Sequence, residues 1–181
     1  SVAHAGYILL AMPVMSSDSI YAIMIYFIMY LFMNLGAFFV VIAVKNKTGG
    51  ETFDDFKGLG WEMPFIAIVM TLFMVSLTGL PPTAGFIGKF YIFASLIKGG
   101  EPFYGLVIIG GINSVISLYY YIRVVKVMYF DGDKSETLLN PPVMIIVMLL
   151  LTAVPTLLFG VYWAPLAGWI QNSLVFYLQT I

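Results

Sequence analysis

The stretch that decides the fold reads Leu77-Thr78-Gly79-Leu80-Pro81-Pro82-Thr83-Ala84-Gly85-Phe86-Ile87-Gly88-Lys89-Phe90. It lies within residues 63–97, an apolar segment in which Lys89 is the one charged side chain. That segment is too long for one straight membrane crossing of about 20 residues. Helix-breaking residues interrupt it, namely Gly79, Pro81, Pro82 and Gly85. We therefore predict two half-helices separated by a break at residues 78–85.

The composition places the chain in a lipid bilayer. Of its 181 residues, 61% are hydrophobic and only 9% are charged, whereas a soluble domain carries about 25% charged residues. So few charges cannot cover a water-facing surface, which excludes soluble proteins, nucleic-acid-binding proteins and disordered tails. Cysteine is absent and histidine occurs once, so we expect neither a disulfide framework nor a metal site.

The uncharged gaps between clusters of charge are of helix length, so we predict an all-α, polytopic bundle of transmembrane helices over residues 1–163. The predicted spans are residues 1–15 (incomplete), 20–44, 63–97 (broken), 103–122 and 142–163. Residues 164–181 carry no charge and include Trp169, which predicts an interfacial helix along the membrane surface. Because the first residues read as the middle of a helix, we expect the chain to be the C-terminal piece of a longer protein.

The distribution of lysine and arginine selects between two arrangements of residues 63–97. Cytoplasmic loops carry an excess of these residues. If the segment crosses the membrane once, six basic residues lie on one side and Lys98 alone lies opposite; if it forms a hairpin, the division is four against three. The single broken crossing is therefore favoured. It places loops 45–62 and 123–141 in the cytoplasm and the C-terminus on the other side.

Lys89 lies about one turn beyond the break and is the strongest candidate for a functional residue. Broken transmembrane helices are tolerated only where they are buried in protein or line a cavity, and in transporters such breaks mark ion and substrate sites. An ionisable residue inside a membrane is costly and by default indicates function. We interpret Lys89 as a proton carrier. The alternative is that its side chain extends to the membrane boundary near Lys98.

Further polar residues follow helical spacing within the spans. Tyr26, Tyr30 and Asn34 form one stripe. A second stripe consists of Gly110, Asn113, Ser117 and Tyr121. For Ser117 and the tyrosines we favour hydrogen bonds between helices, whereas Asn34 could equally belong to a proton path. The single histidine, His4, is either a hydrogen-bonded buried side chain or a proton relay.

At this point the motifs show a family resemblance. Ser1-Val2-Ala3-His4-Ala5-Gly6-Tyr7 resembles the S-[IV]-[AS]-H-x-G-[YF] signature of the antiporter-like membrane subunits of respiratory complex I. Residues 33–38 are similar to the next helix of that family, and residues 77–90 to its discontinuous helix. Residues 119–130 add a match to the subunit N group of bacterial NADH:quinone oxidoreductases.

The resemblance implies a fourteen-helix subunit built from two inverted five-helix repeats. This chain would supply helices 10 to 14, the first of them incomplete, and so belongs to the second inverted repeat. The resemblance also implies a multi-pass protein of the bacterial inner membrane with a periplasmic C-terminus. Lys89 would carry protons as part of a central axis, with the break matched by Gly79, Pro81, Pro82 and Gly85. NADH, FMN, iron–sulfur clusters and quinone would be bound by other subunits, and this subunit would hold no cofactor.

The partners implied are the other membrane subunits of complex I and the lipid bilayer, with no nucleic acid. The subunit would translocate protons, coupled to quinone reduction elsewhere in the complex, without an electron-transfer site of its own. One alternative from the residues is a subunit of a multisubunit cation/proton antiporter. Another is a purely structural role in packing against neighbouring subunits.

Overall fold

The computed structural model describes residues 2–132, 139 and 141–179, and its described part is helical without strands. The helices are α1 Val2–Ala11, α2 Ser17–Thr48, α3 Leu59–Glu62, α4 Pro64–Thr78, α5 Ala84–Gly99, α6 Tyr104–Phe130, α7 Val143–Val161 and α8 Ala164–Gln179. Short 3₁₀ turns lie at Met12–Val14, Phe53–Phe56 and Glu101–Phe103. The all-α fold class is therefore confirmed.

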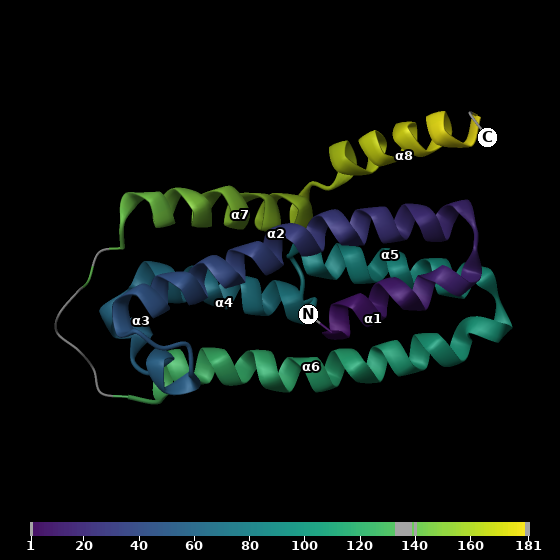
Figure 1. Ribbon diagram of the computed structural model, residues 1–181. Coiled ribbons are helices and arrows are strands. Elements are labelled where there is room, and N and C mark those ends of the chain that lie inside the picture. Colours follow the sequence, from purple (N-terminus) through teal and green to yellow (C-terminus); the bar gives the residue numbers. More distant parts are fainter. Residues whose placement is uncertain (1, 133–138, 140, 180–181) are drawn as a thin grey trace.

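The long helix α2 forms the axis against which the other helices pack. Helices α4 and α5 lie end to end along it (Figure 1), and both contact it. A hairpin would have placed α4 beside α5, so the geometry is that of one broken helix. The buried residues of α2 face α4 at Met33 and Val40, and face α5 at Ala22 and Tyr26.

Three helices are long and apolar enough to cross a membrane within the described residues: α2, the segment Glu101–Phe130 that contains α6, and α7. Two of them run further than the uncharged gaps indicate. Helix α2 begins after Ser16, whose side chain and that of Ser19 form a capping box, and it ends at Gly49 in the left-handed region. Helix α6 continues to Phe130 rather than ending at residue 122, because a charged residue can mark a membrane boundary without ending a helix.

Helix α8 lies lengthwise beside the N-terminal half of α2 (Figure 1). Its Leu166 and Ile170 are buried in a cluster with Ile25 and Met29 of α2. The apolar face of α8 is thus buried by packing along α2. The interfacial position of residues 164–181 relative to a membrane stays a prediction.

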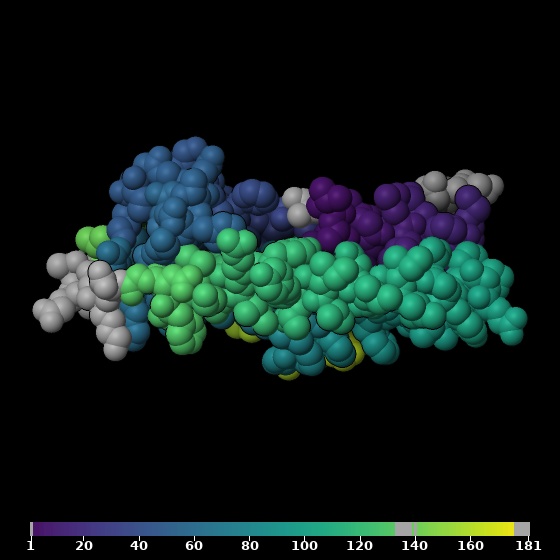
Figure 2. Space-filling view, turned by 90° about the horizontal axis from the view of Figure 1, so that it is seen from below, coloured from purple at the N-terminus to yellow at the C-terminus, as the bar shows by residue number. Residues whose placement is uncertain are grey.

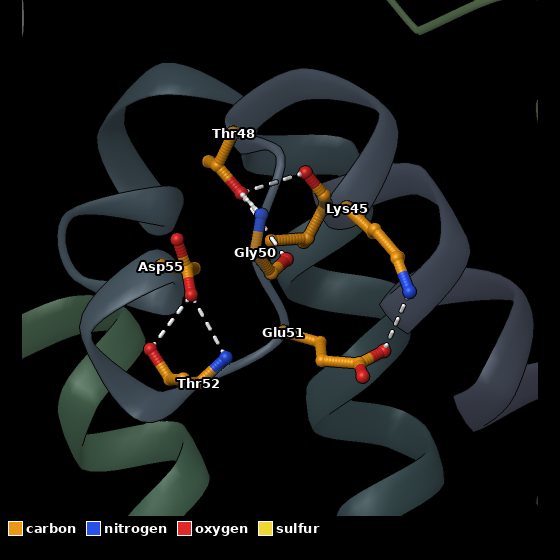
Figure 3. A network of polar contacts seen from close by, with 7 residues as sticks. Lys45, Thr48, Gly50, Glu51, Thr52 and Asp55 are labelled. Carbon is orange, nitrogen blue, oxygen red and sulfur yellow. Dashed lines mark hydrogen bonds and ion pairs between the residues drawn. The ribbon is translucent and has the colours of Figure 1, made fainter.

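The loop after α2 is held by local polar contacts (Figure 3). Asp55 Oδ2 accepts hydrogen bonds from the backbone N–H and the hydroxyl of Thr52, at 2.8 and 2.7 Å. Lys45 forms an ion pair with Glu51 at 3.2 Å. These contacts give residues 45–62 a defined shape at the end of the bundle where Lys45 and Lys47 lie.

Helix α6 covers one face of the bundle and presents apolar side chains outward. Figure 2 shows it running across this whole face, with α1 beside it. Its exposed apolar residues include Ile108, Ile109, Ile112, Val115, Ile116 and Tyr119. Such a surface is suited to lipid or to another apolar protein surface, and not to water.

Candidate functional site

The break between α4 and α5 is a defined piece of backbone. Helix α4 ends at Thr78 and is capped by Gly79, whose φ of 87° lies in the left-handed region that favours glycine. The Pro81–Pro82 peptide bond is cis, and α5 begins after Thr83, whose hydroxyl donates to the Leu80 carbonyl at 2.6 Å. The non-helical residues are therefore 79–83, inside the expected range of 78–85.

The two half-helices touch at Ser76 and Gly85. The backbone N–H of Gly85 donates to Ser76 Oγ at 3.2 Å. A Cβ atom on Gly85 would collide with the carbonyl group of Ser76, so this close approach requires glycine. Helix α7 packs against the other side, where a Cβ on Gly160 would collide with the backbone of Pro82 and Thr83. The break is therefore packed against protein at Thr83 and Gly85, whereas Leu80, Pro81 and Pro82 are exposed in this chain.

Lys89 is buried and turns back toward the break. Only 5% of its surface is exposed, and its Nζ donates to the carbonyl oxygen of Thr78 at 2.7 Å. Thr78 is the last residue of α4, where carbonyl groups lack helical partners and the helix dipole favours a positive charge. The side chain does not extend along α5 to Lys98, so the alternative of a lysine reaching the membrane boundary does not describe this structure.

Two further groups contact the Lys89 ammonium, and both come from other helices. Ser114 of α6 accepts a hydrogen bond from Nζ at 3.5 Å. The ring of Tyr7 from α1 lies with its centroid 4.6 Å from Nζ, in a cation–π contact. Tyr7 and Ser114 share a hydrogen bond of 2.6 Å between their hydroxyl groups, in which either can donate. Lys89 therefore lies where α1, α4, α5 and α6 meet.

His4 is the centre of a second polar cluster, one turn before Tyr7 on α1. Its Nδ1 lies 2.7 Å from the hydroxyl of Tyr26, and its Nε2 lies 2.9 Å from that of Tyr121. The imidazole also stacks on Tyr30 with a centroid distance of 4.9 Å. A neutral histidine can satisfy both tyrosines by donating to one and accepting from the other. In the described residues no hydrogen bond joins this cluster to Lys89.

Asn34 is not hydrogen-bonded to either cluster. Its side chain is half-buried, one turn beyond Tyr30 on α2, and within the described chain no hydrogen bond links it to Lys89 or His4. Of the three residues predicted for a proton path, Lys89 and His4 each have polar partners on other helices. The roles of all three stay predictions.

Sequence reasoning passed over Tyr7 and Ser114 as partners of Lys89. A signal for Tyr7 existed, because it follows His4 by three residues and so shares its helix face. Ser114 stands four residues after Gly110 and three before Ser117, so it fits the polar stripe of α6 as well as Asn113 does. Nothing in the sequence tells which of these residues faces Lys89.

A groove of about 570 Å³ reaches Lys89 from the outside. Its polar lining comes from Thr78, Lys89, Lys98 and Ser114, and its walls are largely aromatic and aliphatic side chains of α5. Lys98, at the far end, forms an ion pair with Asp18 at 2.8 Å. Lys89 thus lies at the inner end of a largely apolar groove.

Comparison with known proteins places this site in a family. Residues 1–117, which carry α1, the broken helix and Ser114, match the family described as NADH:quinone oxidoreductase/Mrp antiporter, TM. The chain belongs to this transmembrane family. Every residue of the Lys89 site lies within the matched part.

Curated members of the family resemble the chain over most of its length. It is 49% identical to NADH-quinone oxidoreductase subunit N 2 of Sorangium cellulosum, over 96% of this chain and 35% of that protein. It is 41% identical to NADH-quinone oxidoreductase subunit N of an Anaeromyxobacter species, again over 96% of this chain and 35% of that protein. The chain spans about a third of the length of these relatives.

Two solved structures share the fold. Respiratory complex I from Thermus thermophilus with bound aureothin contains a chain that matches with a TM-score of 0.69 and 24% identity, over 91% of this chain and 37% of that one. The membrane-bound sulfane sulfur reductase, an archaeal respiratory membrane complex, matches with a TM-score of 0.76 and 24% identity, over 87% and 32%. The antiporter-like helical architecture expected from the motifs is thereby confirmed.

Proposed function

We propose that the chain is part of a proton-translocating membrane subunit of a bacterial NADH:quinone oxidoreductase, in which Lys89 carries the proton. The observation that carries this proposal is the burial of Lys89 beside the break, with its Nζ in contact with Thr78, Ser114 and the ring of Tyr7. The relatives named subunit N support the choice of complex. The other membrane subunits and the lipid bilayer are its partners.

The contacts around Lys89 suit a group that alternates between charged and neutral. The carbonyl of Thr78, at the negative end of α4, stabilises the ammonium form. The hydroxyl of Ser114 can accept from the ammonium form and can donate to the neutral amine. A change of charge on a neighbouring part of the complex would shift the balance between these forms. The residues of this chain thus hold and release a proton, while NADH, FMN, iron–sulfur clusters and quinone belong to other subunits.

In a bacterial inner membrane, the positive-inside rule places loops 45–62 and 123–141 in the cytoplasm and the C-terminus in the periplasm. Lys45, Lys47 and Lys57 then lie on the cytoplasmic side, and each forms an ion pair with an acidic residue there. Lys98 and Asp18 pair at the opposite end of the bundle.

The test is substitution of Lys89 in the intact complex, with proton uptake into membrane vesicles measured during NADH oxidation. Lys89→Ala should reduce uptake to less than about a tenth, since positioned proton-transfer groups contribute at least 10²-fold. Lys89→Arg keeps the charge but cannot release a proton, so it should fail as well, whereas Lys89→Glu restores a titratable group and should retain part of the uptake. The control is Lys126→Ala, which removes an exposed lysine that does not line the Lys89 groove and should leave the uptake unchanged. Wild-type uptake in Lys89→Ala or Lys89→Arg would refute the role of Lys89.

The same vesicles separate the proposal from a cation/proton antiporter, which the family description also covers. Without redox substrates, an antiporter exchanges protons when a sodium or potassium gradient is imposed. A subunit of an oxidoreductase should show no such exchange above vesicles that lack the complex. Cation-driven exchange that disappears in Lys89→Ala would assign the antiporter function instead.

A further inference from the structure

We propose that Tyr7 is a positioning residue for the proton transfer assigned to Lys89: the face of its ring stabilises the protonated side chain and keeps the ammonium beside the C-terminal end of α4. This inference rests on the proton-carrying role proposed for Lys89. It goes beyond that role by naming the interaction that sets the pH range over which Lys89 can take up a proton.

Lys89 is a buried cation whose contacts in the described part of the chain are all with neutral groups. The ion pairs that lysines form there involve Lys45, Lys47, Lys57, Lys98 and Lys126. The atoms that accept from its Nζ are the carbonyl oxygen of Thr78 and the hydroxyl oxygen of Ser114. With no carboxylate among these partners, the negative face of the Tyr7 ring is a third source of compensation for the charge.

The geometry of the contact favours a strong interaction. The ring centroid of Tyr7 lies 4.6 Å from Nζ, within the distance of about 6 Å over which a ring attracts a cation. Lys89 is 5% exposed and Tyr7 is 1% exposed. A cation–π contact is stronger at a desolvated ammonium than at an exposed one. The ring therefore stabilises the ammonium form of Lys89 and does much less for the neutral amine.

The Tyr7 ring is held in place from its polar end and from its edges. Its hydroxyl lies 2.6 Å from Ser114 Oγ and donates to the Gly110 carbonyl at 3.3 Å, both on α6. The rings of Phe93 and Tyr26 pack against it edge to face, with centroid distances of 6.2 and 6.1 Å. The ring is thus anchored from three helices besides its own, and its face stays directed at Lys89.

The other titratable groups around the site are left in place when the Tyr7 ring is exchanged. His4 lies at the edge of this ring, with centroids 6.0 Å apart, and its two nitrogens are bonded to Tyr26 and Tyr121 instead. Helices α4 and α7 carry no titratable residue. The titratable side chains facing the site from the neighbouring helices are His4, Tyr26, Tyr30, Tyr120 and Tyr121, with the Lys98–Asp18 ion pair at the end of the groove.

The experiment changes the charge distribution of the ring while nearly keeping its shape. In the intact complex, Tyr7→Phe is the reference, because it retains the ring over Lys89, and it should keep most of the proton uptake. Position 7 is then filled by phenylalanine with one, two and three ring fluorines, which withdraw electron density from the face. NADH-driven proton uptake into vesicles is measured as a function of pH, at equal amounts of assembled complex.

Each added fluorine should lower the pH at which uptake falls to half on the alkaline side. A weaker ring face favours the neutral amine, so Lys89 stops taking up protons at a lower pH. Over the whole series we expect a shift of about one pH unit, which is tenfold in the proton-loading equilibrium. Tyr7→Leu, which has no ring, should shift the profile in the same direction.

The matched control places the same fluorinated residues at Phe73. This ring on α4 is also fully buried, and it lies beside Gly36 of α2. Fluorination there changes the packing of an aromatic ring by the same amount, but it should leave the pH profile of uptake where it is.

The outcomes separate the ring from the lysine. If Lys89→Ala fails to pump but the fluorinated series at position 7 keeps the pH profile of Tyr7→Phe, the ring does not act on Lys89, and the proposed function stands without it. If Tyr7→Leu lowers uptake equally at every pH, the ring serves packing alone, which also overturns the inference. Wild-type pumping by Lys89→Ala would overturn the proposed function itself.

Discussion

The contact between Gly85 and Ser76 allows a quantitative test of how the break is held. A Cβ atom at Gly85 would lie 2.7 Å from the carbonyl carbon of Ser76 and closer still to its oxygen. Atoms in favourable contact are about 3.5 Å apart, so Gly85→Ala must separate α4 from α5 by about 0.8 Å or more. The obstacle is backbone, which cannot rotate away as a side chain can.

The expected cost follows from that overlap. Overpacking of a close-packed interior costs about 1–3 kcal/mol, and a collision with backbone belongs at the upper part of that range, about 2 kcal/mol or more. For a chain of this size, 1 kcal/mol corresponds to about 2–4 °C in the midpoint of thermal unfolding. Gly85→Ala should therefore lower the midpoint by about 4–8 °C, measured on the purified complex as loss of assembled subunit on heating.

The matched control is Gly105→Ala. Gly105 is also the second residue of a helix, and a Cβ there would meet nothing within 4 Å. Alanine has the higher helix propensity, by about 1 kcal/mol, so this variant should be as stable as wild type or slightly more stable. A midpoint for Gly85→Ala that equals that of Gly105→Ala would refute the close approach of the two half-helices.

Two further predictions concern other parts of the molecule. A Cβ on Gly110 would lie 2.7 Å from the Phe93 ring, whereas one on Gly111 would meet nothing within 4 Å. Gly110→Ala should therefore lower the unfolding midpoint of the complex and its NADH-driven proton uptake, and Gly111→Ala should change neither. Equal behaviour of the two variants would contradict the packing of α6. Hydrogen bonds from Thr52 hold the pKa of Asp55 below its ordinary value of 3.8. The contribution of this contact to the stability of the folded loop is therefore complete above about pH 4, and it is lost as the pH falls through the lowered pKa. Thr52→Val should raise the Asp55 pKa toward 3.8 in a carboxyl-carbon NMR titration, and an unchanged titration would show that the hydroxyl does not bind the carboxylate.

The position of Lys89 explains how a membrane protein can keep an ammonium group away from water. An isolated charge in the bilayer is costly, but the C-terminal end of α4 offers an unpaired carbonyl at 2.7 Å and the negative end of a helix dipole. That end exists only because the helix is broken at Gly79. The break and the lysine are thus two parts of one arrangement, and neither would be stable in the bilayer without compensation from the other.

The charge pattern locates a candidate span but not the end of its helix. The uncharged gap 103–122 lies almost wholly within α6, which continues past Arg123 and Lys126 to Phe130. Backbone hydrogen bonds decide where a helix ends, and a basic side chain in the last turns does not interrupt them. Similarly, the apolar residues 164–181 predicted a helix, but which face of it is buried depends on the surface that α2 offers to Leu166 and Ile170.

The sequence by itself determined the membrane class, the all-helical fold, the break near residues 78–85 and the exceptional position of Lys89, because each depends on local composition and on which residues can continue a helix. Only the tertiary structure decided what Lys89 touches. Thr78 lies 11 residues away, Ser114 25 residues away and Tyr7 on another helix. Helical periodicity assigns each residue to a face of its own helix but carries no information on how four helices are rotated against one another. That rotation is set by close packing at points such as Gly85 against Ser76, Gly88 against Tyr26 and Gly110 against Phe93.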